Sequence, residues 1–72
     1  MKRNDIDQAI SDLTRSIELA PIEASGYYNR GLAFRQKGDI EKARADFRRA
    51  LELVKVPELR ELIEKQLQEL DG

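Results

Sequence analysis

The stretch that decides the fold runs from Ala24 to Leu53 and reads ASGYYNRGLAFRQKGDIEKARADFRRALEL. The dipeptide Gly38-Asp39 divides it into two segments of helical length, about 24–37 and 40–54. Glycine tolerates the left-handed backbone that ends a helix, and aspartate is a good N-cap for the helix that follows. Because the link has only two residues, we expect the two helices to fold back on each other as an antiparallel hairpin.

Apolar side chains recur at helical spacing in both halves of this hairpin. They are Tyr27, Tyr28, Gly31, Leu32, Ala33 and Phe34 in the first half, and Ile40, Ala43, Phe47, Ala50, Leu51 and Val54 in the second. Gly31 lies inside a helix, where glycine costs about 1 kcal/mol relative to alanine. We therefore expect a neighbouring backbone to pass Gly31 too closely for a side chain.

A helix is predicted on either side of the hairpin. The helix over about 5–19 has Asp5 as a candidate N-cap, with Gln8 completing a capping box, and Pro21 ends it. The helix over 57–70 opens with Pro57 in its first turn. Their apolar stripes are Ile6, Ala9, Ile10, Leu13 and Ile17, and Leu59, Leu62, Ile63, Leu67 and Leu70. The sequence therefore predicts an all-α fold with four helices.

The first helix repeats the third at an offset of 34 residues. Seven aligned pairs are identical: Asp5/Asp39, Ile6/Ile40, Ala9/Ala43, Asp12/Asp46, Arg15/Arg49, Glu18/Glu52 and Leu19/Leu53. Agreement at polar as well as apolar positions favours a true internal repeat over two generic amphipathic helices.

The segment 24–53 resembles a tetratricopeptide repeat, a family whose repeat is also 34 residues long. The matching residues are the aromatics Tyr27 and Phe34, the helix-A glycine Gly31, and the helix-B core residues Ala43, Phe47 and Ala50. Two residues depart from the pattern: Arg30 stands for the usual leucine, and Lys55 for the proline that commonly ends helix B. The resemblance implies antiparallel hairpins of the α-solenoid type. Neither departure threatens this fold, since Arg30 can lay its aliphatic stem on apolar surface.

The resemblance divides the domain 1–72 into three parts. Residues 5–21 match the second half of a repeat, residues 24–55 match a full repeat, and residues 57–70 match a C-terminal capping helix. We expect the first helix, without a partner helix A, to expose apolar surface and to pack on a second copy or an exchanged segment. The alternative is a closed monomer in which the last helix folds over the first.

Charge is unevenly distributed although it nearly cancels, at a net −1. Residues 1–29 carry a net −2, residues 30–55 a net +4 and residues 56–72 a net −3. These blocks could steer one copy onto another, or they could be chance variation on exposed helix faces.

The resemblance implies a binding function, because helix A of each repeat lines a concave groove in this family. The groove positions correspond to Ser25, Tyr28, Asn29, Leu32, Arg35 and Gln36. An aromatic ring, an amide, an apolar group and a guanidinium suit an extended peptide with an acidic group or a C-terminal carboxylate. Asn29 matches the asparagine that contacts the terminal carboxylate in members that bind chaperone tails, but the neighbouring basic residues of that clamp have no counterparts here.

Other functions are not favoured. The chain has no histidine and no cysteine, so a serine nucleophile lacks the usual base and a metal lacks its usual ligands. We therefore expect no enzyme activity, no metal site and no cofactor. Arg44, Arg48 and Arg49 could contact nucleic acid, but Asp46 and Glu52 interrupt this basic stripe.

No segment resembles a membrane span or a signal peptide, so we expect a cytoplasmic protein without a membrane partner. The predicted function is a scaffold that binds a peptide or protein partner. The alternative is a structural element that assembles with copies of itself.

Overall fold

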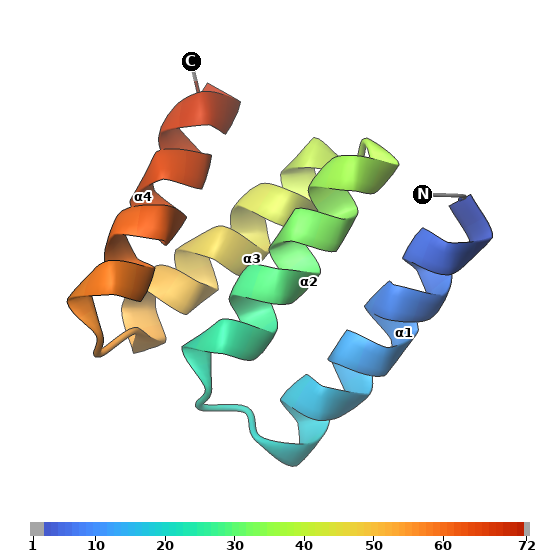
Figure 1. Ribbon diagram of the computed structural model, residues 1–72, viewed down its shortest axis with the longest axis horizontal. Helices are drawn as coiled ribbons and strands as arrows, with labels where there is room; N and C mark the ends of the chain where they lie inside the picture. Colours follow the sequence, from blue (N-terminus) through green and yellow to red (C-terminus); the bar gives the residue numbers. More distant parts are fainter. Residues whose placement is uncertain (1–2, 72) are drawn as a thin grey trace.

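The computed structural model describes residues 3–71, and these residues form all four predicted helices (Figure 1). They are α1 (Arg3–Leu19), α2 (Ala24–Lys37), α3 (Ile40–Leu53) and α4 (Pro57–Asp71). The all-α fold of antiparallel hairpins is therefore confirmed. The ends of the predicted domain, residues 1–2 and 72, lie outside the described part.

The helices form a slab of 32 × 32 × 17 Å. Figure 1 shows α1 at one edge and α4 at the other, with the α2–α3 hairpin between them. Helix α2 packs on α1 and α3, and α4 packs on α3. The last helix therefore does not fold over the first, and the closed arrangement is not the one found.

The hairpin forms as predicted. Gly38 has φ of 94°, in the left-handed region, and its N–H donates to the carbonyl of Arg35 at 3.1 Å. The N–H of Asp39 donates to the carbonyl of Phe34 at 2.9 Å, and the Asp39 carboxylate accepts from the N–H of Lys42 at 3.4 Å. Gly38 and Asp39 thus provide hydrogen-bond partners both for carbonyl groups at the end of α2 and for an N–H group at the start of α3.

Gly31 is required by a side chain and not by a backbone, which corrects the prediction. A Cβ atom at Gly31 would lie 2.7 Å from Cε1 and 2.8 Å from Cδ1 of Phe47, closer than such atoms approach. Phe47 is fully buried, as are Ala43, Ala50 and Ile63. The ring of Phe47 therefore occupies the space that a side chain at position 31 would need.

The predicted start of α1 is wrong. The helix already includes Arg3, so Asp5 lies in its first turn and is not the N-cap. Gln8 donates its amide to the carboxylate of Asp12 at 3.1 Å and does not complete a capping box. The repeat-related Asp39 follows a glycine that breaks the preceding helix, whereas Asp5 follows Asn4, which continues it.

Two residues assigned to buried stripes are exposed. Ile40, the first residue of α3, is 37% exposed, and Leu62 on α4 is 49% exposed. Ile40 lies directly after the Gly38-Asp39 turn, at the closed end of the hairpin. Leu62 is turned by about 100° from the fully buried Ile63, which places it at the edge of the contact between α3 and α4.

The apolar stripe of α1 is covered in part, since Ala9, Ile10 and Leu13 are half-buried. Ile6 and Ile17 are each 7% exposed because they pack toward α2. Gly26 of α2 permits this approach, since a Cβ there would lie 3.1 Å from Cγ1 of Ile17. Leu19, at the end of the helix, is 81% exposed.

Candidate peptide-binding face

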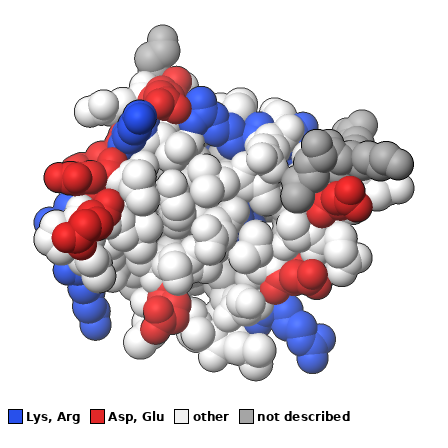
Figure 2. Space-filling model, in the orientation of Figure 1, with Lys and Arg blue, Asp and Glu red and all other residues white. Residues whose placement is uncertain are grey.

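Helix α2 presents an uncharged stripe to solvent. Ser25, Asn29, Leu32 and Gln36 follow one another at intervals of four, three and four residues, so they share one side of the helix. Ser25, Asn29 and Gln36 are exposed, and Leu32 is half-buried against the core. We call these four residues the α2 face. Figure 2 shows that the middle of the molecule, over α2, is free of charged side chains, which gather around its margin.

Four of the six predicted groove residues, Ser25, Asn29, Leu32 and Gln36, therefore lie together on the α2 face. The other two, Tyr28 and Arg35, are seven residues apart and share a neighbouring side of α2. Arg35 contacts α4, and Tyr28 packs on Phe47 with ring centroids 5.9 Å apart and planes tilted by 51°. Tyr28 is half-buried, so part of its ring belongs to the core and part borders the α2 face.

Arg35 does not present a free positive charge. Its guanidinium donates to the carboxylate of Glu69 at 2.8 Å and to the side-chain oxygen of Gln66, both on α4. The side chains of Arg35 and Glu69 are 35% and 42% exposed, so the pair is partly shielded from water. The contact joins α2 to α4. It also reduces the attraction of Arg35 for an acidic ligand.

A second arginine forms an ion pair that was not among the predictions. Arg30 donates two hydrogen bonds of 2.7 Å to the carboxylate oxygens of Asp46 and a longer one of 3.4 Å to the hydroxyl of Thr14. Its guanidinium lies 5.8 Å from the ring centroids of Tyr27 and Phe34. The contacts therefore connect α1, α2 and α3 at one point.

The Arg30–Asp46 pair is largely buried, with side-chain exposures of 21% and 8%. The bidentate hydrogen bonds to Asp46 raise the pKa of Arg30 above its ordinary value, although burial acts in the opposite direction. A signal for the pair was present in the sequence. Asp46 lies three residues after Ala43 and four before Ala50, so it falls on the buried stripe of α3 and needs a partner.

The uneven charge distribution also has a structural basis. Cations of α2 and α3 pair with acidic residues of the two outer helices: Lys37 with Asp7 at 2.6 Å, Arg35 with Glu69 at 2.8 Å, and Arg44 with Asp71 at 2.9 Å. The basic middle of the chain thus lies between two acidic helices, and its positive charge offsets their negative charge within one molecule.

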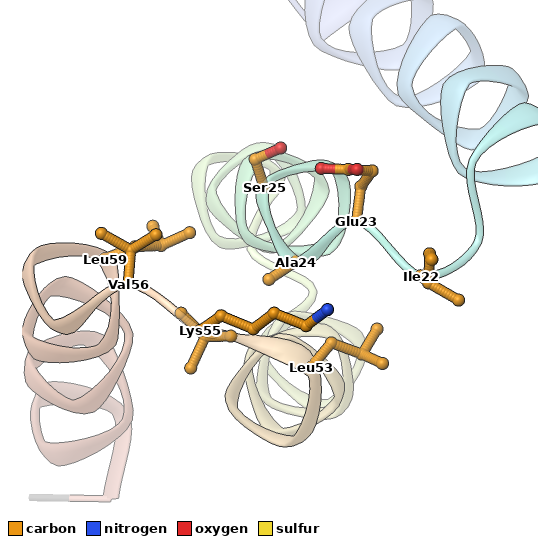
Figure 3. Close-up of a pocket in the computed structure, with 9 residues that line it drawn as sticks. Ile22, Glu23, Ala24, Ser25, Leu53, Lys55, Val56 and Leu59 are labelled. Atoms are coloured by element: carbon orange, nitrogen blue, oxygen red, sulfur yellow. The ribbon is translucent and has the colours of Figure 1, made fainter.

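A cavity of about 340 Å³ opens at the end of the molecule where α2 begins and α3 ends. Its apolar lining includes Ile22, Leu53, Val56 and Leu59, and Glu23, Ser25 and Lys55 are its polar lining residues (Figure 3). Ile22 is 71% exposed and Val56 is 52% exposed. Because Ser25 lines the cavity and also belongs to the α2 face, the two features adjoin.

Comparison with known proteins agrees with this architecture. The family model described as "Tetratricopeptide repeat" matches residues 1–56, more than three quarters of the chain. The chain belongs to the tetratricopeptide repeat family. Tetratricopeptide repeats generally mediate interactions between proteins, and proteins of the family are typically scaffolds without enzyme activity.

A curated relative with a tetratricopeptide repeat is the "Tetratricopeptide repeat protein 36 homolog" of Nematostella vectensis. It is 39% identical over 49 residues, which are 68% of this chain and 27% of the relative. The chain therefore corresponds to about a quarter of that protein's length. No solved structure matches the chain.

Among residues 3–71, no group of three or more acidic side chains is placed to hold a metal ion. None of the helices in that range combines the length and the hydropathy needed to cross a membrane.

Proposed function

We propose that this chain binds an extended segment of a partner protein along the α2 face, with Tyr28 at its border. The observation that carries the proposal is the exposure of an uncharged stripe, Ser25, Asn29, Leu32 and Gln36, beside an ordered hydrophobic core. Amide and hydroxyl groups at regular spacing can pair with a peptide backbone, and Leu32 offers an apolar contact. The proposal involves no catalysis and no cofactor, and it includes a cytoplasmic location for the protein.

The role of Arg35 in the proposal differs from that predicted from the sequence. Glu69 and Gln66 already satisfy its guanidinium, so Arg35 fixes α4 beside α2 and does not serve as the main anchor for an anion. Asn29 and Gln36 remain free to bind, because both are exposed.

The proposal is tested by selecting binders from a library of randomised dodecapeptides displayed on phage. Wild-type protein and the variant Asn29→Ala/Leu32→Ser are used as separate targets. We expect peptides that bind wild type at least about tenfold better than the variant, since apolar and amide contacts on one face are lost together. Circular dichroism must show that the variant keeps its helices. Equal binding to both proteins would exclude the α2 face as the site.

Self-association is a second candidate function, favoured by the exposed apolar side chains at the cavity end. Leu19 is 81% exposed and Ile22 71% exposed. Burial of such groups against another copy would be favourable. Light scattering over a wide concentration range tests this, because a single species at the 8.3 kDa monomer mass throughout would exclude it.

A further inference from the structure

We infer that the α2 face, together with the cavity beside it, recognises a segment with an aliphatic residue next to lysine or arginine and disfavours acidic segments. This inference rests on the proposed function and assigns the chemistry of the partner. The free guanidinium of Arg35 predicted a ligand with an acidic group. Because Arg35 is paired with Glu69 in the structure, the inference reverses that expectation.

The side of α4 that faces α2 is identified by its contacts. Gln66 and Glu69 reach Arg35 of α2. Residues seven and eleven positions before Glu69 lie on the same side of the helix, and these are Leu62 and Glu58. Leu62 is 49% exposed and Glu58 is exposed as well. Helix α4 therefore offers an apolar group and a carboxylate beside the α2 face.

Negative charge prevails where the α2 face meets the cavity. Glu23 occupies the N-cap position of α2, is exposed, and makes no side-chain capping hydrogen bond. Neither Glu23 nor Glu58 has an ion-pair partner among the side chains that the structure describes. The carboxylates of both residues are thus available to a ligand.

None of the described positive charges nearby is ion-paired with either of these two carboxylates. Arg35 is paired with Glu69. Lys65 lies one helical turn from both Glu61 and Glu69, so acidic neighbours offset it. Lys55 lines the cavity, and Figure 3 shows its amine on the side of Leu53, Ile22 and Glu23, away from the start of α4. Lys55 forms no ion pair with either carboxylate among the described side chains.

The cavity supplies the apolar part of the recognition. Val56 and Leu59 at the start of α4 and Ile22 before α2 line it, and a volume of about 340 Å³ accommodates an aliphatic side chain. Glu23 is a lining residue of the same cavity, and Glu58 lies next to Leu59 in the chain. A ligand with an aliphatic residue in the cavity can therefore place an adjacent basic side chain near either carboxylate.

The dodecapeptide selection tests this chemistry when two further targets are added. The first is Glu23→Gln/Glu58→Gln, which removes both carboxylates. The matched control is Glu64→Gln, because Glu64 lies seven residues before Asp71, on the side of α4 that contacts Arg44 of α3. The best peptide from wild type is then labelled, and its affinity for each variant is measured by fluorescence anisotropy.

The expected result is that selected peptides carry an aliphatic residue beside lysine or arginine and few acidic residues. Loss of both carboxylates should weaken the best peptide by about two- to tenfold, the range of two exposed ion pairs, and the control should leave its affinity unchanged. Selection of acidic peptides that bind the Asn29→Ala/Leu32→Ser variant less tightly than wild type would overturn this inference and leave the proposed function intact. Basic peptides unaffected by Glu23→Gln/Glu58→Gln would also overturn the inference. Selected peptides that bind the Asn29→Ala/Leu32→Ser variant as well as wild type would contradict both.

Discussion

The two sides of α2 differ in how much change they can accept. On the side toward α3, Gly31 lies against the fully buried ring of Phe47, with no space for even one more carbon atom. On the opposite side, Asn29 and Gln36 are exposed and contribute little to the core. One helix thus carries the residues that fix the fold and the residues free to specify a partner. Substitutions on the side toward α3 should therefore change stability most, and substitutions on the exposed side should change binding.

The largest expected effect on stability comes from the aromatic ring that α2 packs against. Phe47→Ala should lower the free energy of unfolding by about 3–5 kcal/mol, as is typical for removing a buried aromatic side chain. A small domain has about 5–15 kcal/mol in total, so the variant should be near its unfolding transition at room temperature. Urea unfolding followed by circular dichroism measures the change. A loss below 1 kcal/mol would show that the ring is not central to the core.

The next effect concerns the pair between Arg30 and Asp46. Asp46→Ala should cost about 2 kcal/mol, less than for a fully buried pair because Arg30 keeps contact with water. The repeat-related Asp12 provides the matched control, since it is exposed and bonds only to Gln8 in its own helix. We expect Asp12→Ala to change stability by about 0.5 kcal/mol or less in the same urea experiment. Equal losses for the two variants would contradict the structural role of the pair.

A smaller loss is expected for Gly31→Ala. The new Cβ clashes with the ring of Phe47, at a typical overpacking cost of about 1–3 kcal/mol, and alanine regains about 1 kcal/mol of helix propensity. The net loss should be about 1 kcal/mol. Combining Gly31→Ala with Phe47→Leu should give less than the sum of the two losses, because the clash is with the ring itself. Strict additivity in a double-mutant cycle would show that the two residues do not interact.

The smallest effect on stability is expected on the α2 face. Asn29→Ala and Gln36→Ala should change the free energy of unfolding by about 0.5 kcal/mol or less, since both side chains are exposed. The same variants should weaken the binding of a selected peptide, measured by fluorescence anisotropy. A large loss of stability would place these residues among those that hold the fold.

The fold was predictable because its signals are local. Gly38-Asp39 marks the turn through the backbone preferences of two adjacent residues, and Pro21 and Pro57 mark helix ends in the same way. Gly31 was correctly assigned to a close contact, but its neighbour was not. A glycine indicates that space is occupied, and it does not indicate whether a ring or a backbone occupies it.

The candidate site was less predictable because it depends on contacts between distant residues. Arg35 contacts Glu69, which lies 34 residues further along the chain. Nothing in the sequence around Arg35 distinguishes a free guanidinium from one engaged by another helix. The exposed position of Leu62 likewise depends on how far α4 rotates against α3, and the apolar pattern of α4 alone allows either orientation.

The most direct test of the account is nuclear magnetic resonance of the ¹⁵N-labelled chain during titration with a selected peptide. If the α2 face binds the peptide, the amide signals of Ser25, Asn29, Leu32 and Gln36 should shift most. Those of Arg48 and Glu52, exposed on α3, should stay in place. If the largest shifts fell on Arg48 and Glu52 while the α2 face remained unchanged, the division of α2 into a structural side and a binding side would be wrong.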